Sequence, residues 1–319
     1  MYTFFMSEKT VLVGTYTDSG SKGIYSFKFQ DGELSSPELF ANINSPKYLS
    51  VEDGLVASIG KFDRGAGAAV FNPVGELISS CSYENKTSCY VTWHNGKVYT
   101  ANYHEGTFSV LSFENNELKL LKKVEIKDGA GAHQVLFHGD KVLVPCLFLD
   151  RIMIFDEELS YVGSINFPDG TGPRHGVFSS DGTLLYLVSE LSNELYVLDT
   201  EDWKMRSVLP VLPDGETYVR GTAAVRLSED NDKLYVSTRG QDIISVIDLK
   251  QMKVIQGAYS GGKHPRDFIL LDHHVISGNR YSDTVVSFKL REDGTIGEET
   301  ERITIPQAVS FALLEINED

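Results

Sequence analysis

Residues 184–199 read LLYLVSELSNELYVLD, and residues 233–248 read KLYVSTRGQDIISVID. The two stretches align without a gap, and in each a short apolar run is followed by a polar turn and a second apolar run. Apolar residues that alternate with polar ones over such short runs are typical of β-strands joined by a turn. We therefore interpret the stretch as a repeated unit that contains two strands.

Copies of this unit recur from one end of the chain to the other. Seven of them end 40 to 49 residues apart, near Phe29, Phe71, Phe113, Asp156, Asp199, Asp248 and Phe288. Seven copies in 319 residues leave room for four short strands in each copy. The pattern predicts an all-β fold, a seven-bladed β-propeller with four antiparallel strands per blade, in which residues 1–319 form a single domain. A β-sandwich or several small β domains would not repeat in phase along the whole chain.

A propeller ring needs a blade that joins the two ends of the chain. The first predicted strand covers residues 10–14, and the last two cover residues 302–305 and 308–314. We expect these three strands to share one blade and to close the ring.

The composition argues against several classes of partner. The chain carries 29 Lys and Arg against 45 Asp and Glu, which gives a formal net charge of −16. A strongly negative chain is repelled by phosphate backbones and anionic lipid, so we expect neither a nucleic-acid nor a membrane partner. No apolar run approaches the roughly 20 residues that cross a bilayer.

The N-terminal residues and the cysteines favour a cytoplasmic protein. Residues 1–6 are apolar but lack the basic segment of a signal peptide, and Met6 is an alternative start. The three cysteines, Cys81, Cys89 and Cys146, form no CxxC pair. This usage suits a reducing compartment and predicts neither a disulfide framework nor a zinc site.

The register of the repeat gathers charged residues at one end of the central channel. Equivalent positions at the starts of the innermost strands hold Lys47, His133, Arg174 and Arg266. Equivalent positions at the ends of the second strands hold Tyr103, Leu147, Glu190, Arg239 and Arg280. Because the first and second strands of a blade form a hairpin, both sets meet at the same end of the channel, which we call the mouth.

This mouth predicts a binding site for a small anion. A funnel lined by charges of one sign concentrates the opposite charge, and the planar fork of arginine matches phosphate and carboxylate oxygens. The alternative is that these are rim charges paired with the surplus acidic residues.

Other residues of the chain are expected to have structural roles. No GxSxG nucleophile motif and no HExxH metal motif occurs in the sequence. His175 follows Arg174 in a strand, so its side chain should point to the opposite face and pack there. Cys89 is expected to be a small buried residue rather than a nucleophile. Tyr16 is expected to be a core aromatic residue, with a position at the border of the mouth as the alternative.

Five short motifs follow one another along the chain at propeller spacing. They are GTYT at 14–17, GAH at 131–133, GPRH at 172–175 with Glu190 after it, STRG at 237–240 and HPRDF at 264–268. Together they resemble the seven-bladed propeller lactonase family, which includes the propeller-type 6-phosphogluconolactonases and the related fungal carboxy-muconate lactonising enzymes. The resemblance extends over all seven blades in order.

The resemblance implies an active site at the mouth. Its catalytic residues would be His133, Arg174, Glu190 and Arg239. The repeat register adds Lys47, Tyr103, Arg266 and Arg280 as substrate-binding candidates. The implied reaction is hydrolysis of 6-phospho-D-glucono-1,5-lactone to 6-phospho-D-gluconate, a step of the pentose phosphate pathway, with no metal and no cofactor. The chain departs from the family pattern at Thr238, where asparagine is common, and in having a single histidine in the GAH motif.

The residues leave several points of mechanism open. Either His133 or Glu190 activates the water, while Arg174 and Arg239 steady the oxyanion. Alternative functions are another small-anion reaction of the same family, such as a muconate-type cycloisomerisation or hydrolysis of another lactone, and non-catalytic binding. We expect a small anionic sugar lactone as the substrate and a monomer or weak homodimer as the assembly.

Overall fold

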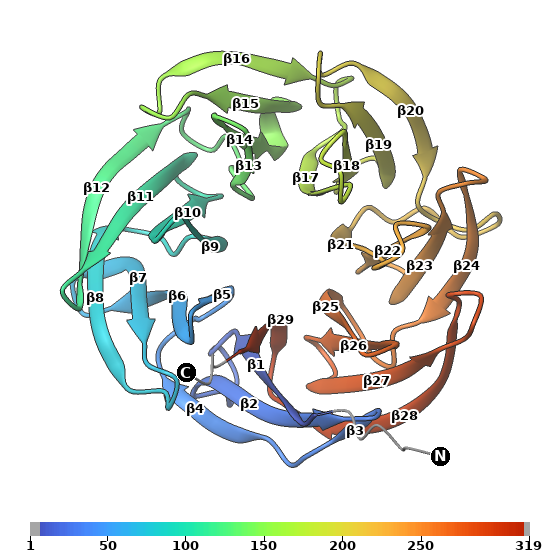
Figure 1. The fold of residues 1–319 in the computed structure, drawn as a ribbon, viewed down its shortest axis with the longest axis horizontal. Helices are drawn as coiled ribbons and strands as arrows, with labels where there is room; N and C mark the ends of the chain where they lie inside the picture. Colours follow the sequence, from blue (N-terminus) through green and yellow to red (C-terminus); the bar gives the residue numbers. More distant parts are fainter. Residues whose placement is uncertain (1–6, 316–319) are drawn as a thin grey trace.

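Each copy of the repeat folds as one antiparallel sheet, and the sheets are arranged as blades around a central channel (Figure 1). The structure is a computed structural model that describes residues 7–315. The expectations for residues 1–6 and for Met6 therefore lie outside the described residues. Within the described range there are seven sheets, so the predicted seven-bladed propeller is confirmed.

Six blades are each built from four strands in chain order, with the first strand innermost. The first three of these blades contain β5 (Leu49–Glu52), β6 (Leu55–Phe62), β7 (Gly65–Phe71) and β8 (Leu77–Glu84); β9 (Tyr90–His94), β10 (Lys97–Asn102), β11 (Thr107–Glu114) and β12 (Glu117–Glu125); and β13 (Leu136–His138), β14 (Lys141–Cys146), β15 (Arg151–Phe155) and β16 (Tyr161–Asn166). The next three contain β17 (Pro173–Phe178), β18 (Leu184–Ser189), β19 (Glu194–Asp199) and β20 (Met205–Pro210); β21 (Thr222–Leu227), β22 (Lys233–Thr238), β23 (Ile243–Asp248) and β24 (Lys253–Tyr259); and β25 (Pro265–Leu271), β26 (His274–Asn279), β27 (Thr284–Leu290) and β28 (Ile296–Thr304). In the described part of the chain the single helical element is η1 (Leu147–Leu149), a short 3₁₀ turn.

The seventh blade is made from both ends of the chain. Its innermost strand, β29 (Ala308–Leu314), pairs with β1 (Lys9–Thr15), which is followed by β2 (Gly23–Gln30). The outer position is divided between β3 (Glu33–Leu34) and β4 (Glu38–Asn42), which both pair with β2. The prediction that residues 10–14 and 308–314 share this blade is confirmed.

The prediction for residues 302–305 is wrong. Residues 302–304 belong to β28, the outer strand of the preceding blade, where Arg302 pairs with Val286 and Thr304 with Thr284. The chain then turns inward through Gln307, which has a φ of 51°. This turn separates the outer strand of one blade from the innermost strand of the next.

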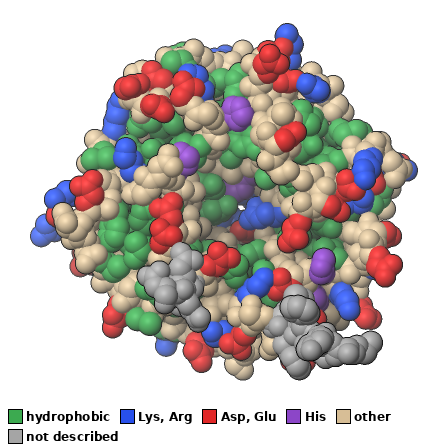
Figure 2. Space-filling model, viewed as in Figure 1, with side chains coloured by type: hydrophobic (Ala, Val, Ile, Leu, Met, Phe, Trp, Pro, Cys, Tyr) green, Lys and Arg blue, Asp and Glu red, His purple; other side chains and the backbone are tan. Residues whose placement is uncertain are grey.

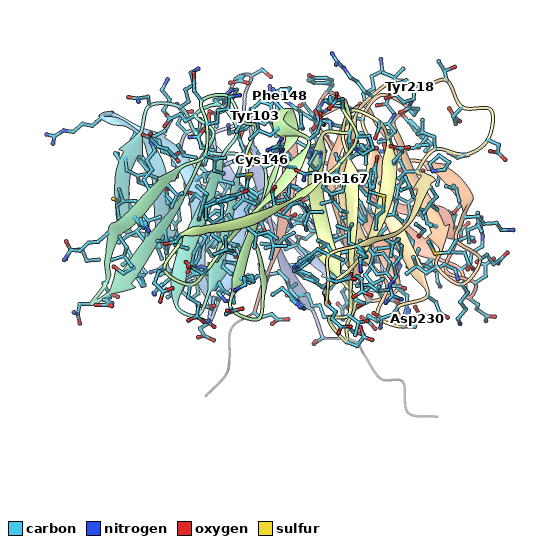
Figure 3. All side chains as sticks on the ribbon, turned by 90° about the horizontal axis from the view of Figure 1, so that it is seen from above. Tyr103, Cys146, Phe148, Phe167, Tyr218 and Asp230 are labelled. Carbon is cyan, nitrogen blue, oxygen red and sulfur yellow. The ribbon has the colours of Figure 1, made fainter. Side chains whose placement is uncertain are left out.

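The register predicted for the second strands is confirmed. The strands β10, β14, β18, β22 and β26 end one residue before Tyr103, Leu147, Glu190, Arg239 and Arg280 respectively. Figure 3 places Tyr103 and Phe148 at one end of the molecule and Asp230 at the other. The end that carries Tyr103 is the mouth.

Apolar side chains between neighbouring blades hold the ring together. Leu143 and Ile152 of one blade pack with Leu185 and Leu187 of the next, and all four side chains are fully buried. Branched apolar residues suit this position because they fill the pleated surface of a sheet. Their burial contributes about 25 cal/mol per Å² of apolar surface removed from water.

Gly14 allows the closing blade to pack tightly against its neighbour. A Cβ atom at this residue of β1 would overlap the carbonyl oxygen of Pro46 and the hydroxyl of Ser310 in β29. The Pro46 oxygen belongs to the backbone, so it cannot move aside as a flexible side chain can.

We therefore expect Gly14→Ala to lower the free energy of unfolding in urea by about 2 kcal/mol, as overpacking of a core does. The matched control is Gly163→Ala in β16, where a new Cβ meets no atom within 4 Å. Equal stability of the two variants would contradict this account of ring closure.

Candidate active site

The mouth contains a carboxylate held between two arginines. Glu190 Oε2 lies 2.8 Å from Arg174 Nε, and Glu190 Oε1 lies 2.9 Å from Arg239 Nη2. Arg174 also donates from Nη1 to the carbonyl oxygen of Ala223 on the following blade, and its side chain is 1% exposed. Three of the predicted catalytic residues are therefore in direct contact.

A β-bulge directs Arg174 toward this contact. In the pairing of β17 with β18, the register shifts between Pro173 and His175, so Arg174 is the extra residue. The same shift occurs in β25 between Pro265 and Asp267, around Arg266. Because a bulge turns a side chain away from the regular alternation, the Pro-Arg pairs of the sequence mark the points where cations enter the mouth.

The charges of Glu190, Arg174 and Arg239 shift one another's pKa values. Burial alone would raise the pKa of Glu190, but Arg174 and Arg239 outweigh burial and hold that pKa below its usual value. Burial, together with the nearby charge of Arg239, lowers the pKa of Arg174 to about 10. At neutral pH the group therefore consists of one carboxylate and two guanidinium ions.

Beside this group lies a pair of buried histidines. His133 Nδ1 is 3.1 Å from His175 Nε2, and both rings are almost fully buried. Burial, followed by the charge of Arg174, lowers the pKa of each imidazole well below its usual value. Both are therefore neutral at pH 7, and one ring donates its proton to the other.

The expectation for His175 covers only part of its role. Its partner His133 lies on the preceding blade, whereas Arg174 contacts its own blade and the following one, so the two side chains do diverge. His175 also packs edge-to-face against Tyr48 and Tyr90. The sequence missed the contact with His133 because it joins two blades 42 residues apart.

Tyr103 extends this group toward the surface. Its ring centroid lies 5.8 Å from that of His133 in an edge-on arrangement, and 5.3 Å from that of Phe148 in η1. Figure 3 shows Tyr103 and Phe148 together at the mouth end of the molecule. The structure thus brings this predicted substrate-binding residue next to His133.

A second group of cations surrounds the ring of Tyr16. The guanidinium of Arg280 lies 3.6 Å from the ring centroid, that of Arg266 lies 5.7 Å away, and the ammonium of Lys47 lies 5.6 Å away. Arg266 also donates to the carbonyl oxygen of Lys47 at 3.1 Å. Tyr16 therefore borders the mouth, and the expectation of a core aromatic residue is wrong.

These cations differ from Arg174 and Arg239 in having few acidic partners. Among residues 7–315, neither Lys47 nor Arg266 takes part in an ion pair, although each is only 7% exposed. Arg280 contacts the exposed carboxylate of Asp18 at 3.3 Å. The alternative that all mouth cations are paired with acidic residues therefore does not hold for this group.

The unpaired cations change the titration of their neighbours. Arg266 above all, with Lys47 and Arg280, lowers the pKa of the Tyr16 phenol despite its burial. Burial lowers the pKa of the Lys47 ammonium. Both shifts are those expected where positive charge is in excess and water is excluded.

The remaining candidates behave as structural residues. Cys89 is buried, burial raises the pKa of its thiol, and all three cysteines are free.

Among the described residues there is no group of three or more His, Cys, Asp or Glu side chains that could hold a metal ion. Figure 2 looks onto the end of the ring opposite the mouth, where acidic and basic side chains are interspersed around a narrow central opening.

Comparison with known proteins identifies the family. The family model described as "Lactonase, 7-bladed beta-propeller" matches residues 10–313. The chain belongs to this lactonase family. It is therefore a lactone hydrolase, as its five motifs predict.

Relatives of this lactonase agree with the assignment. The 6-phosphogluconolactonase of Bacillus subtilis is 28% identical over 339 aligned positions, which cover 95% of this chain and 97% of the relative. A solved structure from Lactobacillus plantarum has a TM-score of 0.89 at 26% identity and covers 97% of this chain and 100% of its own. The periplasmic gluconolactonase of Pseudomonas aeruginosa, at 23% identity, shares the fold with a TM-score of 0.86 and covers 97% and 100%.

No helix in the described part of this lactonase is long and apolar enough to span a bilayer.

The mouth contains groups whose chemistry suits lactone hydrolysis. A neutral imidazole can accept a proton from water, and guanidinium groups can stabilise an oxyanion.

The buried histidine pair gives a direct test of this site. We expect the imidazoles of His133 and His175 to remain neutral as the pH falls through about 6.5, where an ordinary histidine becomes charged. Their ring NMR signals, assigned with the variant His175→Asn, should stay unchanged between pH 7.5 and 6. A titration midpoint near 6.5 for either ring would contradict the burial and charge seen here.

Proposed function

We propose that this lactonase hydrolyses 6-phospho-D-glucono-1,5-lactone to 6-phospho-D-gluconate. The observation that carries the proposal is the set of buried cations without acidic partners, Lys47 and Arg266, next to the neutral histidine pair. The name of the Bacillus subtilis relative, a 6-phosphogluconolactonase, supports the same substrate. In this proposal the protein acts in the cytoplasm, in the pentose phosphate pathway, as a monomer or weak homodimer without a cofactor.

In this proposal the substrate phosphate binds to the cations that surround Tyr16. Among the described residues, no carboxylate forms an ion pair with Lys47 or Arg266, and Arg280 pairs only with the exposed Asp18. A phosphate dianion would supply the missing charge and accept hydrogen bonds from the guanidinium forks. An unphosphorylated neutral lactone would leave two buried cations uncompensated.

The lactone ring then lies over His133, with Tyr103 beside it. His133 is the stronger candidate for the base, because the pKa of Glu190 is held low by two guanidinium groups. With the proton of His133 on Nδ1 and donated to His175, its Nε2 is free to accept a proton from water. Glu190 is then a positioning residue that orients Arg174 and Arg239.

The reaction balances with these groups alone. Nε2 of His133 takes a proton from water, and the resulting hydroxide forms a bond to the lactone carbonyl carbon. Arg174 and Arg239 stabilise the negative charge that develops on the carbonyl oxygen. When the bond from this carbon to the ring oxygen breaks, the imidazolium returns the proton to the leaving oxygen.

Turnover of the phosphorylated lactone tests the base. We expect His133→Asn to lower kcat by about 100-fold or more, because a general base contributes 10²–10⁴-fold. Loss of 6-phosphogluconolactone, generated in place, is followed with and without enzyme and corrected for spontaneous opening. The control is His273→Asn, a change of an exposed histidine outside the mouth, which should keep full activity. Unchanged turnover in His133→Asn would remove His133 from this role.

Selectivity tests the phosphate subsite. We expect Arg280→Ala to raise KM for the phosphorylated lactone about tenfold or more, the effect of losing a hydrogen bond to a charged group, while KM for glucono-δ-lactone changes little. Arg206→Ala is the control, since Arg206 lies exposed on β20 and pairs with Asp199. A dicarboxylate lactone serves as the third substrate. Preference for that substrate or for glucono-δ-lactone in the wild-type enzyme would overturn the proposed substrate.

A further inference from the structure

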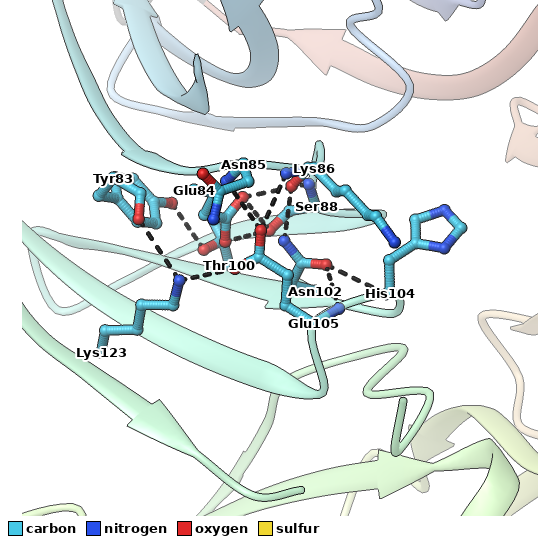
Figure 4. A network of polar contacts seen from close by, with 10 residues as sticks. All are labelled: Tyr83, Glu84, Asn85, Lys86, Ser88, Thr100, Asn102, His104, Glu105 and Lys123. Atoms are coloured by element: carbon cyan, nitrogen blue, oxygen red, sulfur yellow. Dashed lines mark hydrogen bonds and ion pairs between the residues drawn. The ribbon is translucent and has the colours of Figure 1, made fainter. Parts of the chain in front are cut away.

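Behind Lys47 lies a buried carboxylate that the proposed reaction does not use. Glu84 is the last residue of β8, and it is 4% exposed. Its carboxylate accepts hydrogen bonds from the Ser88 hydroxyl at 2.8 Å and from the Ser88 backbone N–H at 3.2 Å (Figure 4). Glu84 thus closes the turn of residues 84–88 in the loop that leads from β8 to β9.

Side chains of the next blade hold the same loop from the other side. Glu105 Oε1 accepts hydrogen bonds from the backbone N–H groups of Asn85 and Lys86, both at 2.8 Å. Asn102 donates from Nδ2 to the carbonyl oxygen of Lys86 at 2.7 Å. The backbone of residues 84–88 is therefore fixed by a network that Figure 4 shows as one continuous cluster.

This network fixes the position of one backbone carbonyl group, that of Thr87. The oxygen of Thr87, which lies between Lys86 and Ser88, accepts a hydrogen bond from Lys47 Nζ at 3.5 Å. Because Glu84 holds Ser88, it also holds the neighbouring carbonyl that receives the ammonium. Burial has the largest effect on the pKa of Lys47 and lowers it, while the charge of Glu84 is one of the smaller effects that raise it, after that of Tyr16.

The surroundings of Glu84 raise the pKa of its carboxyl group. Burial raises its pKa to about 7, with a smaller contribution from the charge of Glu105. Hydrogen bonds from Ser88 and Asn102 and the charge of Lys123 act in the opposite direction. The side chain therefore changes between neutral and charged near neutral pH.

We propose that Glu84 is a positioning residue for Lys47, and that its proton makes the mouth bind anions more tightly below neutral pH than above it. The inference rests on the proposed function, in which Lys47 binds the substrate phosphate. Protonation of Glu84 removes a negative charge from behind Lys47 while Ser88 keeps its hydrogen-bonding partner. By reciprocity, an anion bound at Lys47 raises the proton affinity of Glu84.

Binding of inorganic sulfate tests this coupling without any lactone. Sulfate keeps its charge of two between pH 6 and pH 8, so a change in its affinity comes from the protein. We expect calorimetry to show about threefold to tenfold tighter binding of sulfate at pH 6 than at pH 8. This is the effect on affinity expected when one nearby negative charge is removed in partly buried surroundings. In Glu84→Gln the affinity should be the same at both pH values and close to that of the wild type at pH 6.

Two further variants separate charge from position. Glu84→Ala removes both the charge and the acceptor for Ser88, whereas Glu84→Gln removes only the charge, so Glu84→Ala should bind sulfate more weakly than Glu84→Gln at both pH values. Glu76→Gln, an exposed carboxylate of the same blade, should behave as the wild type at both pH values.

The outcomes distinguish this inference from the proposed function. If Glu84→Gln binds sulfate with the pH dependence of the wild type, the role of Glu84 is overturned while the phosphate subsite stands. If the wild type does not bind sulfate at all, the role of Glu84 is overturned together with the phosphate subsite.

Discussion

The pairing of β29 with β1 is the contact on which the mouth depends. It closes the ring, and the turn that precedes it delivers Gln307, whose carbonyl oxygen accepts a hydrogen bond from the backbone N–H of Tyr16 at 3.2 Å. Tyr16 in turn carries the guanidinium of Arg280 on its ring. The pairing of β29 and the turn before it therefore help to set the position of Tyr16, around which Lys47, Arg266 and Arg280 lie.

The mouth divides into two halves of different electrostatic character. On one side, Glu190 forms ion pairs with both Arg174 and Arg239, which hold these guanidinium groups beside the neutral histidines. On the other side, Lys47 and Arg266 are buried with no carboxylate of the described residues in contact, which is unfavourable in the absence of a ligand. In the proposed function, the anionic substrate offsets this cost in stability, in a protein whose net charge is −16.

The sequence predicts the fold and the register well because both follow from local periodicity. The in-phase repeat fixed the number of blades, and the hairpin rule placed Glu190 and Arg239 at one mouth. Contacts between blades are not encoded in any single repeat, so the pairing of His175 with His133 and the place of Tyr16 were missed. Residues 302–304 were misassigned because a short alternating run does not show which of two neighbouring blades the strand joins. The roles of the site residues remain predictions.

The two-ended blade has a consequence for synthesis of the protein. The ribosome releases β1 first and β29 last, so the nascent chain holds six complete blades before the seventh can close. Until Ala308–Leu314 leave the exit tunnel, the partner edge of β1 is unpaired and Tyr16 lacks the backbone contact from Gln307. Assembly of the mouth is thus coupled to completion of the polypeptide, because chains that stop before β29 lack both the β1 pairing and the Gln307 contact to Tyr16.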